Sequence, residues 1–524
     1  MYGRAARAKK RKKNMLSKIT GFGLDGLIGY EATLETDINA GLPGMDIVGL
    51  VGQSVKESKE RVKSAIKNSG FDFPIKKITV NIAPADIKKD SPHFDLPIAV
   101  GILAASGQVA SGYADFIMLG ELSLDGTVRR INGVMPMLIS ALQSGFKRFI
   151  IPHENMNEAA FIEGLEIYAV KNLTDVCGFL NGDIELKPIE FCSYHSALAK
   201  SSYNSDFSDV KGQLKAKRAI EIAVSGGHNI LMIGPPGAGK TMLAKCIPGI
   251  MPSMTFDEAI EVTKIHSVAG ILSLDDGIVT VRPFRSPHHT ATTVALIGGG
   301  ARSKPGEISL SHNGVLFLDE MPEYSRYTLE TLRQPLEDKT VTVSRAMRTV
   351  EYPADITLVA SMNPCPCGNF GSKTQRCSCS PFAIHKYLNK LSGPLLDRID
   401  LHVEVDGVAF EEMYDGKKAE ASSIIKNRVE ETREIQRKRF ENETVYTNSS
   451  MGNSQLSKYC RLDASSEKLL ETAFKKLNFT ARAVTRILKV ARTVADMEKS
   501  ADIKSDHIAE AIQYRSLDRK YRLV

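Results

Sequence analysis

The N-terminal part of the chain alternates segments with strand-like and helix-like patterns of hydrophobic residues. YEATLETDI (30–38) and KKITVNIA (76–83) alternate apolar and polar positions, and RFIIP (148–152) is a short, mostly apolar run. These patterns are typical of β-strands. SVKESKERVKSAIKNSG (54–70) instead repeats its apolar residues at helical spacing. The alternation predicts an α/β or α+β domain over residues 15–185.

Three further regions follow this domain. Residues 186–210 are rich in serine and show little periodicity, which indicates a linker. Residues 211–410 again combine apolar strand-like runs with helical patterns and predict a second α/β domain. Residues 411–524 are mostly helical in pattern, with a charged helix expected at 422–440 and an amphipathic helix at 480–496. The chain shows no internal repeat.

The positive charge of the chain is concentrated at its start. The formal net charge is +7, and residues 1–14 contain seven Lys and Arg residues and no acidic residue. The rest is neutral by formula, with 61 basic residues (68 less these seven) and 61 acidic ones. A binding surface for a polyanion on the folded part therefore depends on local clustering of charge. We interpret residues 1–14 as a basic disordered tail or as an extension before a true start at Met15; a DNA-binding arm is the alternative.

The overall composition is that of a folded globular protein. The 524 residues are enough for about three domains, and 43% of them are hydrophobic. No run approaches the roughly 18 to 20 consecutive apolar residues of a membrane helix, and the start lacks the apolar core of a signal peptide. We therefore expect a cytoplasmic protein with no membrane partner. In that reducing compartment cysteines are more often metal ligands, catalytic groups or core residues than disulfides.

A phosphate-binding motif lies near the start of the second domain. HNILMIGPPGAGKTMLAKCI (228–247) is an apolar strand followed by Gly-x-x-x-x-Gly-Lys-Thr and a helical pattern, which is the context that a nucleotide-binding phosphate loop requires. In such a loop backbone N–H groups surround the phosphates, Lys240 contacts the β- and γ-phosphates, and the Thr241 hydroxyl binds Mg²⁺. The predicted nucleotide-binding residues are Gly234, Pro235, Pro236, Gly237, Ala238, Gly239, Lys240 and Thr241.

Two later strands end in polar residues suited to ATP hydrolysis. HNGVLFLDEMPE (312–323) ends its apolar run in an acidic pair, from which Asp319 would bind Mg²⁺ and Glu320 would polarise the attacking water. ADITLVASMNP (354–364) ends in Asn363, whose amide would orient that water and sense the γ-phosphate. A strand ending in Asp-Glu is by itself more often a solvated turn. Placed after a phosphate loop, it predicts, together with the other two strands, an ATP hydrolase of the P-loop class.

Five segments of the second domain form a set that is specific in type and in order. They are GPPGAGKT (234–241), RPFRSPHHTAT (282–292), KPGEISLSHNGVLFLDE (304–320), SMNPCPCG (361–368) and SGPLLDRIDL (392–401). This set resembles the magnesium-chelatase-like AAA+ ATPases of bacteria, specifically the ComM (YifB) group. The resemblance covers nearly the whole chain from Met15, through segments such as TARAVTRILKVARTVADME. It implies an α/β fold: a P-loop AAA+ ATPase core over 211–410 with a C-terminal helical lid over 411–524, preceded by an α+β Lon-protease-like (ribosomal S5 domain 2-like) domain.

Ring assembly and two arginine roles are implied by this resemblance. It implies a homohexamer with ATP and Mg²⁺ bound between neighbouring subunits, so that one subunit acts on the nucleotide of the next. Arg398, in LLDRID, is similar to the arginine finger of the family, which stabilises the charge of the transferring phosphate. A structural ion pair with Asp397 or Asp400 is the alternative. Arg482 is similar to the second sensor on the lid, with Arg486 as the alternative; a solvated helix face would explain both equally.

Two further features concern the substrate. KTVTVSRAMRTVEY (339–352) alternates apolar and polar residues as a β-hairpin does, with Arg345 and Arg348 near its tip. In related rings such hairpins point toward the central pore, where these arginines would form a positive collar for the backbone of DNA. A solvated turn is the alternative. His288 and His289 are adjacent in RSPHHTAT, which makes joint binding of one metal ion a weak interpretation.

The N-terminal domain resembles the proteolytic domain of the Lon proteases, which uses a serine and a lysine. The aligned segments are KDSPH (89–93), with His93 at the position of the nucleophile, and INGVM, with Met135 at the position of the lysine. Histidine has no hydroxyl to form an acyl-enzyme, and methionine cannot act as a base. We therefore expect a catalytically inactive domain that serves as a scaffold or a DNA-contacting collar. A dyad of Ser91 and Lys89 is the weak alternative, since side chains so close in sequence seldom reach the required geometry.

Four of the eight cysteines lie close together in NPCPCGNFGSKTQRCSCS (363–380), as two Cys-x-Cys pairs. Nucleophilic catalysis is disfavoured because ATP hydrolysis needs no thiol and the segment offers no obvious base, and disulfides are disfavoured by the compartment. Zinc bound as a tetrathiolate in an insertion over 365–379 is the favoured interpretation, although Cys-x-Cys is tighter than common zinc spacing. Metal-free thiols in a surface loop are the alternative. The candidate ligands are Cys365, Cys367, Cys377 and Cys379, with His385 in reserve.

The leading functional hypothesis is an ATP-driven DNA motor. The ComM group is associated with binding DNA and moving branched junctions while incoming DNA is integrated, as in natural transformation. The resemblance therefore implies a helicase or branch-migration factor acting on single-stranded or branched DNA. A chelatase-type ATPase that remodels a protein partner is second, because simple chelatase motors lack the Lon-like domain and the cysteine segment. An ATP-dependent protease is disfavoured by His93 and Met135.

Overall fold

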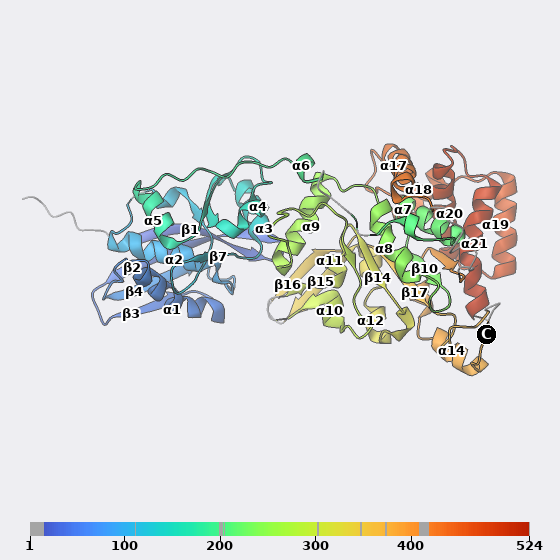
Figure 1. Cartoon of the computed structure of the whole chain (residues 1–524), viewed down its shortest axis with the longest axis horizontal. Helices are drawn as coiled ribbons and strands as arrows, with labels where there is room; N and C mark the ends of the chain where they lie inside the picture. Colours follow the sequence, from blue (N-terminus) through green and yellow to red (C-terminus); the bar gives the residue numbers. More distant parts are fainter. Residues whose placement is uncertain are drawn as a thin grey trace, which may run out of the picture. The chain divides into compact units, whose positions relative to one another are not determined.

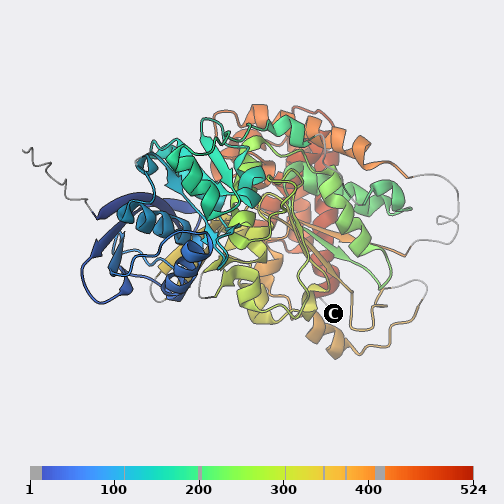
Figure 2. The same cartoon turned by 60° about the vertical axis from the view of Figure 1, so that its left-hand side comes forward.

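The computed structural model describes residues 15–110, 112–198, 203, 205–300, 303–345, 348–371, 375–407 and 419–522, apart from the side chains of Arg345, Arg348 and residues 516–522. The basic segment 1–14 lies outside these residues. The chain divides into two compact units. The first comprises Met1–Ala199 with Thr263–Val279, and the second Lys200–Val262 with Thr280–Val524. Figures 1 and 2 give two views of the chain.

A seven-stranded mixed sheet forms the centre of the first unit, in the order β3-β4-β2-β1-β5-β8-β9. The central strands β1, β2 and β4 are antiparallel, and β3, β5, β8 and β9 extend the sheet with parallel pairs. The strands are β1 (Leu16–Asp25), β2 (Ile28–Asn39), β3 (Gly44–Val48), β4 (Lys77–Ala83), β5 (Ile117–Met118), β8 (Arg148–Pro152) and β9 (Glu166–Val170), with a separate pair β6 (Glu121–Leu122) and β7 (Val128–Arg129). The sheet confirms the strands predicted at 30–38, 76–83 and 148–152.

Helices cover this sheet through apolar faces and a few buried polar contacts. They are α1 (Gln53–Asn68), α2 (Asp95–Ser106), α3 (Val134–Gln143), α4 (Met156–Ala159), α5 (Leu173–Asn181) and α6 (Tyr194–Leu198). Helix α2 is buried over almost its whole length, and its Gly101 carbonyl accepts a 2.7 Å hydrogen bond from Ser17 of β1. Helix α1 is amphipathic and pairs Arg61 with the buried Asp95 at 2.7 Å. The α+β expectation for this domain is confirmed.

A distant segment of the chain completes the first unit. Helix α9 (Phe256–Ala269) begins in the second unit, but residues 263–279 belong to the first. There Ser267 donates a hydrogen bond to the buried Glu158, and the backbone N–H of Gly133 donates to the Ser267 hydroxyl at 3.0 Å. Farther on, Asn157 donates to the carbonyl of Leu274 at 2.8 Å. Nothing in the local pattern of 263–279 indicates this return, since it depends on partners more than a hundred residues away.

Part of the segment predicted as a linker forms regular structure and packs against other parts of the chain. Residues 194–198 form helix α6 and residues 207–209 a 3₁₀ turn. Phe207 is fully buried in the core of the second unit, where its backbone N–H donates to the Ser422 hydroxyl at 2.8 Å. The end of this segment is therefore part of the second unit rather than a free connection.

Five parallel strands form the central sheet of the second unit, in the order β11-β14-β17-β10-β18. They are β10 (Ile230–Ile233), β11 (Phe284–Arg285), β14 (Val315–Leu318), β17 (Thr357–Met362) and β18 (Leu401–Glu404). Every residue of β10, β14 and β17 is buried, as continuous apolar runs in a parallel sheet require. Because these strands are parallel, the residues that follow them gather at one edge of the sheet.

Short helices and two hairpins surround this sheet. The helices are α7 (Leu214–Gly226), α8 (Lys240–Ile250), α10 (Thr293–Ile297), α11 (Glu307–Leu310), α12 (Arg326–Glu330), α13 (Pro335–Asp338), α14 (Pro381–Leu388) and α15 (Gly393–Leu396). The hairpins are β12 (Gly298–Gly299) with β13 (Lys304–Pro305), and β15 (Thr340–Arg345) with β16 (Arg348–Pro353). The second confirms the hairpin predicted at 339–352.

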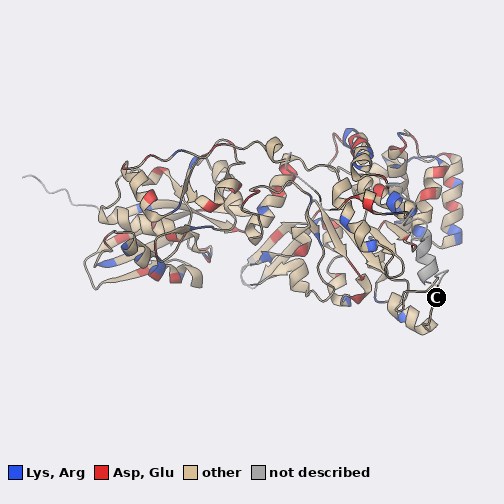
Figure 3. Ribbon diagram, viewed as in Figure 1, with Lys and Arg blue, Asp and Glu red and all other residues tan. Residues whose placement is uncertain are grey.

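The C-terminal part is helical, as predicted. Its helices are α17 (Ser422–Arg439), α18 (Asn453–Tyr459), α19 (Ala464–Leu477), α20 (Ala481–Met497) and α21 (Ser505–Arg522). In both cartoon views, where they are drawn orange to red, they form one group within the second unit (Figures 1 and 2). They share a single apolar core with the sheet and α8. Figure 3 shows acidic and basic residues mixed along α17 and α19, which agrees with the neutral balance of the chain outside residues 1–14.

Candidate active site

The phosphate-loop motif joins β10 to α8. Gly237 and Gly239 have φ values of +76° and +86°, and a Cβ built on either would meet no atom within 4 Å, so the loop borders open space. Gly234 has the opposite constraint, because a Cβ there would lie 2.1 Å from the carbonyl oxygen of Val405. Backbone conformation requires glycine at positions 237 and 239, and the close approach of Val405 requires it at position 234. The resulting turn leaves the N-terminus of α8 able to receive phosphate groups.

Lys240 begins α8 and turns its ammonium group back over the loop. Its Nζ donates to the carbonyl oxygens of Gly234 at 2.7 Å and Pro235 at 2.9 Å, and to the Asn363 amide oxygen at 3.2 Å. Burial lowers the pKa of Lys240, while the nearby charges of Asp319 and Glu320 raise it. The lysine thus connects the phosphate loop with the ends of two other strands.

The acidic pair follows β14, next to the start of α8. Asp319 Oδ2 accepts a 2.8 Å hydrogen bond from the Thr241 hydroxyl, and Asp319 Oδ1 accepts one from Ser361 on β17. A hydroxyl and a carboxylate so close together are the two protein ligands that a phosphate-bound Mg²⁺ uses in P-loop enzymes. Glu320 has a left-handed φ of +50° and a half-exposed side chain, with His289 4.0 Å from its carboxylate. Hydrogen bonds therefore hold the Asp319 carboxylate in place, whereas the Glu320 carboxylate is half exposed and accepts none of these bonds.

Asn363 comes directly after β17, at the same edge of the sheet. Its side-chain oxygen accepts from Lys240, and its backbone N–H lies near the hydroxyl of Tyr387 on α14. Burial raises the pKa of Tyr387, which keeps the phenol neutral. The structure thus brings together Lys240, Thr241, Asp319 and Asn363, which the sequence analysis selected from three separate strands.

Arg398, the predicted finger, lies away from this edge among α13, α15 and α20. Its guanidinium pairs with Glu337 at 2.5 Å and donates to the carbonyl oxygens of Arg333 and Pro394. Its side chain is only 8% exposed, so it is held in one orientation. It lines an open pocket of about 220 Å³ that Arg482 and Arg486 also line. The three arginines considered for action on the phosphates therefore share one pocket.

Arg486 and Arg482 differ in how they are held. Arg486 pairs at 2.7 Å with Asp400, which is 1% exposed and also accepts from His228. Burial by itself would raise the pKa of Asp400, but the charge of Arg486 and the hydrogen bond from His228 outweigh it and hold the pKa below its usual range. Arg482 is exposed, and among the described residues it has no polar partner. Arg486 is therefore committed to a buried ion pair, whereas Arg482 is available to a ligand.

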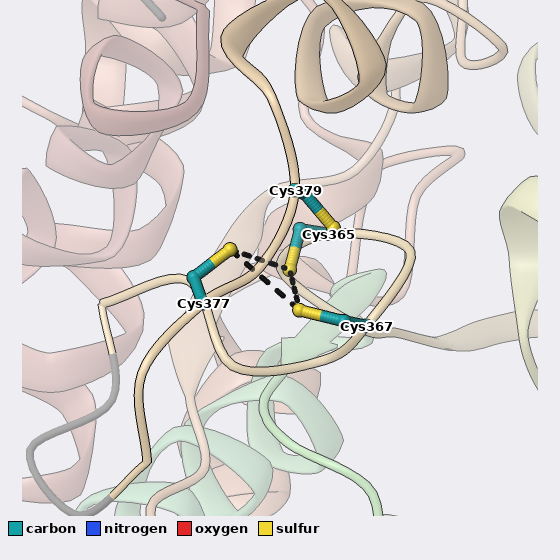
Figure 4. Close-up of side chains that lie close together, drawn as sticks. All are labelled: Cys365, Cys367, Cys377 and Cys379. Carbon is teal, nitrogen blue, oxygen red and sulfur yellow. Dashed lines mark hydrogen bonds between the residues drawn. The ribbon is translucent and has the colours of Figure 1, made fainter.

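The four cysteines of the insertion face one another. Figure 4 shows their side chains converging from the two arms of one loop, and all four sulfurs lie within 4.8 Å of each other. The sulfur–sulfur distances are 3.4 Å for Cys365 and Cys367, 3.7 Å for Cys365 and Cys377, and 3.6 Å for Cys367 and Cys377. They are free thiols, since a disulfide has a sulfur–sulfur distance of about 2 Å. His385, the reserve ligand, instead contacts Asn389.

The remaining candidates of the second unit are placed only in part. In the β15–β16 hairpin Arg345 lies opposite Arg348 in register, which puts both beside the tip, but their side chains lie outside the described residues. His288 and His289 stack at a ring distance of 4.1 Å, and His288 bonds to the Thr290 hydroxyl. Within the described residues, the four cysteines are the group of three or more His, Cys, Asp or Glu side chains close enough to share a metal ion. Among the residues that the structure describes, the histidine pair therefore has no third ligand close enough to share a metal ion.

The protease-like positions of the first unit are buried in neutral surroundings. His93 is 3% exposed and packs against Phe94 at a ring distance of 4.3 Å, and burial lowers its pKa to about 4. Met135 is fully buried at the start of α3. Lys89 is 1% exposed, and burial lowers its pKa as well. A buried neutral imidazole and a thioether cannot replace the nucleophile and base of a Ser-Lys protease.

Comparisons with known proteins agree with this arrangement. Three family models match: Magnesium chelatase, subunit ChlI, over residues 206–413; Subunit ChlI of Mg-chelatase over residues 34–155; and Magnesium chelatase, subunit ChlI C-terminal, over residues 419–515. Competence protein ComM of Haemophilus influenzae is 44% identical over 491 residues, which cover 93% of this chain and 95% of that protein. The chain belongs to the ComM (YifB) group of magnesium-chelatase-like AAA+ ATPases.

Other relatives agree with the ComM-group assignment. Uncharacterized protein YifB of Escherichia coli is 42% identical over 495 residues, covering 93% of this chain and 94% of that protein. Lon protease 2 of Bacillus subtilis is 34% identical over 150 residues, which are 28% of this chain and 26% of the protease. The Lon-like similarity lies in the N-terminal part, as predicted. Membership in the ComM group supports an ATP-hydrolysing role for the second unit. Within the described residues, no helix combines the length and the apolarity needed to cross a bilayer.

Three residues of the candidate site were not assigned to it by the sequence analysis. Ser361 donates to Asp319, the Tyr387 hydroxyl lies near the Asn363 backbone, and His289 approaches Glu320. Only Ser361 carried a usable signal: it is a polar residue inside the apolar run TLVASM, and buried hydroxyls need a partner. Tyr387 and His289 reach the site from segments whose position depends on the tertiary fold.

Proposed function

We propose that this protein is an ATP-driven homohexameric motor that acts on single-stranded or branched DNA, as a helicase or branch-migration factor in the recombination of incoming DNA. The observation that carries the proposal is the convergence of Lys240, Thr241, Asp319 and Asn363 at one edge of the parallel sheet. Its DNA substrate is supported by the resemblance to the ComM group and by the 44% identity to a protein named for competence. A cytoplasmic location fits this role.

The chemistry assigned to this edge is hydrolysis of the γ-phosphate of ATP with Mg²⁺. Lys240 and the loop N–H groups bind the phosphates, and Thr241 and Asp319 are placed to hold Mg²⁺ through oxygen atoms. Glu320, whose carboxylate is half exposed, is the group that polarises water, and Asn363 orients it. Ser361 keeps the Asp319 carboxylate in its orientation by donating to its second oxygen.

Arg398 and Arg482 are proposed to act together on a nucleotide bound by the neighbouring subunit. They line one pocket, and a cationic pair presented to developing phosphate charge stabilises the transition state. Glu337 and two carbonyl groups hold the Arg398 guanidinium in one orientation. Arg482, by contrast, has no polar partner among the described residues. We assign the sensor role to Arg482 rather than to Arg486, whose pairing with the buried Asp400 supports a structural role.

Mixing inactive subunits tests the assembly. Lys240→Met subunits lack a working phosphate loop but present Arg398, whereas Arg398→Ala subunits bind ATP but lack the finger. In a mixed ring some sites combine a normal loop with a normal finger, so a 1:1 mixture should regain ATP hydrolysis that neither variant shows alone. Sedimentation of the mixture should give a hexamer. If a mixed hexamer assembles but ATP hydrolysis does not recover, action between subunits is contradicted.

Stimulation of ATP hydrolysis by DNA tests the substrate. Steady-state phosphate release should rise with single-stranded or forked DNA, and the Arg345→Ala/Arg348→Ala double variant should lose that rise and keep its basal rate. Arg461→Ala, which changes an exposed arginine between α18 and α19, serves as the control. A basal rate that no single-stranded, duplex or forked DNA changes would refute the DNA motor and favour a chelatase-type ATPase with a protein partner.

A further inference from the structure

The cysteine insertion lies directly against the proposed ATP site. Cys365 is two residues beyond Asn363, and α14 begins two residues beyond Cys379. The hydroxyl of Tyr387, on that helix, lies near the Asn363 backbone N–H. The chain thus leaves Asn363 through the four cysteines, and α14 brings it back near the same residue.

The insertion also contacts the phosphate loop. Gly368, between the two cysteine pairs, has a left-handed φ of +83°, and a Cβ there would lie 2.4 Å from Cδ of Pro236. Any larger residue at this position would displace either the cysteine loop or Pro236. The two segments therefore fit against each other without space for a side chain.

The arrangement of the sulfurs matches a metal–thiolate centre. Zinc–sulfur bonds are about 2.3 Å, so the sulfurs of a regular zinc tetrahedron lie about 3.8 Å apart. The three distances among the sulfurs of Cys365, Cys367 and Cys377, 3.4 to 3.7 Å, are close to that value, and the Cys379 sulfur lies within 4.8 Å of the others. A backbone N–H group also points at one of the sulfurs, since Phe370 donates to Cys365 at 3.3 Å. Such donors stabilise thiolates, which are the form that binds metal.

We propose that Cys365, Cys367, Cys377 and Cys379 bind one Zn²⁺, and that this centre positions Asn363 and the phosphate loop for ATP hydrolysis. Four thiolates without an open coordination position form a structural rather than a catalytic zinc site. The metal would close the loop that leaves Asn363 and returns near it, and would press Gly368 against Pro236. The positioning part of this inference rests on the proposed ATP hydrolysis, whereas the metal site does not.

Metal analysis of the purified full chain tests the site. Wild-type protein should contain one zinc per chain, Cys367→Ala almost none, and Cys367→His close to one, because imidazole can replace a thiolate at zinc. Cys192→Ala, an exposed cysteine outside the cluster, should retain full zinc. Cobalt(II) loaded in place of zinc should give the visible absorption of a tetrahedral thiolate complex. A wild-type chain without stoichiometric zinc while its thiols are reduced, or one carrying another metal instead, would overturn the site.

Steady-state kinetics test the positioning role. Zinc-free Cys367→Ala should lose about tenfold in kcat with a smaller change in KM for ATP, since a misplaced catalytic group costs rate. Cys367→His should restore kcat together with zinc. An unchanged kcat in folded, zinc-free Cys367→Ala would refute the positioning role and leave the metal site intact. Absence of ATP hydrolysis in zinc-loaded wild type would instead refute the proposed function, so the two failures are distinguishable. If Cys367→Ala does not fold, removal of zinc from wild type by a chelator and its return provide the same comparison.

Discussion

Each of the two units buries a lysine within a motif that resembles an enzyme family, but the polar groups around the two lysines differ. Lys240 has three oxygen acceptors and lies near Asp319 and Glu320. Lys89 is 1% exposed and, among the described residues, its ammonium group has no hydrogen-bond partner. Burial lowers the pKa of both lysines. Only Lys240 is embedded in a set of polar groups that can bind and hydrolyse a nucleotide.

The first unit keeps its sheet with a histidine and a methionine at the protease-like positions. The sheet of the first unit is stabilised by its apolar core, in which strands, α1 and α2 contribute most residues, and that core does not depend on a nucleophile. His93 and Met135 fill their positions as buried, neutral side chains. The edge of the second sheet, by contrast, holds polar side chains that are suited to binding a ligand. Function therefore has to be argued from such sites rather than from the fold.

The largest expected effect separates the two lysines directly. Lys240→Met should lower ATP hydrolysis by about 10³-fold or more, because it removes a charge aimed at the phosphates. Lys89→Met keeps a similar volume in a buried site and should leave hydrolysis near the wild-type rate. Phosphate release at saturating ATP measures both, with circular dichroism to verify folding. Substantial activity in Lys240→Met, or its loss in folded Lys89→Met, would contradict the assignment of the two sites.

The next effect separates two arginines of one pocket. Arg398→Ala should lower kcat on the order of 10³-fold, as loss of an arginine finger does, with little change in stability because Glu337 is half exposed. Arg486→Ala should instead cost about 3–5 kcal/mol in the free energy of unfolding, since it leaves the carboxylate of Asp400 buried without its main partner. Kinetics and denaturant unfolding should therefore rank the variants in opposite order. The same ranking in both assays would show that the roles are not separate.

The smallest effect concerns acid sensitivity of the first unit. His93 has a pKa of about 4 in the folded chain against an ordinary value of 6.5. Below pH 6.5 the unfolded chain binds a proton that the folded chain does not, so this stability is complete above pH 6.5 and falls as the pH approaches 4. The loss at pH 5 should be about 2 kcal/mol. Hydrogen exchange of peptides from α2 at pH 7 and pH 5, corrected for the intrinsic rate, measures it.

Two variants decide whether His93 is responsible. His93→Phe should reduce the difference in α2 protection between the two pH values, because phenylalanine fills the site and does not titrate. His195→Phe, which changes an exposed histidine of α6, should leave that difference as in wild type. If His93→Phe keeps the full pH dependence, the burial of a neutral imidazole is not its source.

Much of the ATP site follows from local sequence. The phosphate loop carries its own backbone geometry through Gly237 and Gly239, and the apolar runs before Asp319 and Asn363 predict buried strands. Parallel pairing then brings the residues after those strands to one edge. The predicted convergence therefore required only the strand type and the motif, both of which are short-range properties. The roles of these residues stay predictions until the variants are measured.

Other parts of the molecule could not be predicted from local patterns. The choice of Glu337 as partner of Arg398 and of Asp400 as partner of Arg486 depends on how α13 and α20 pack against the loop 397–400. Lys489 lies on α20 with Arg482 and Arg486 but is buried. Its ammonium group donates to the carbonyl of Ser449, and burial lowers its pKa to about 8. Helical spacing predicts which residues share a face but does not identify the neighbour that covers it.

The sequence by itself determined the family, several strands and helices and the phosphate loop, because each is a property of residues adjacent in the chain or of short apolar periods. Only the tertiary structure decided that residues 263–279 complete the first unit, that Tyr387 lies near Asn363, and that Gly368 rests on Pro236. These contacts join segments from different parts of the fold. Their free energy comes from packing and burial that exist only once the chain has folded.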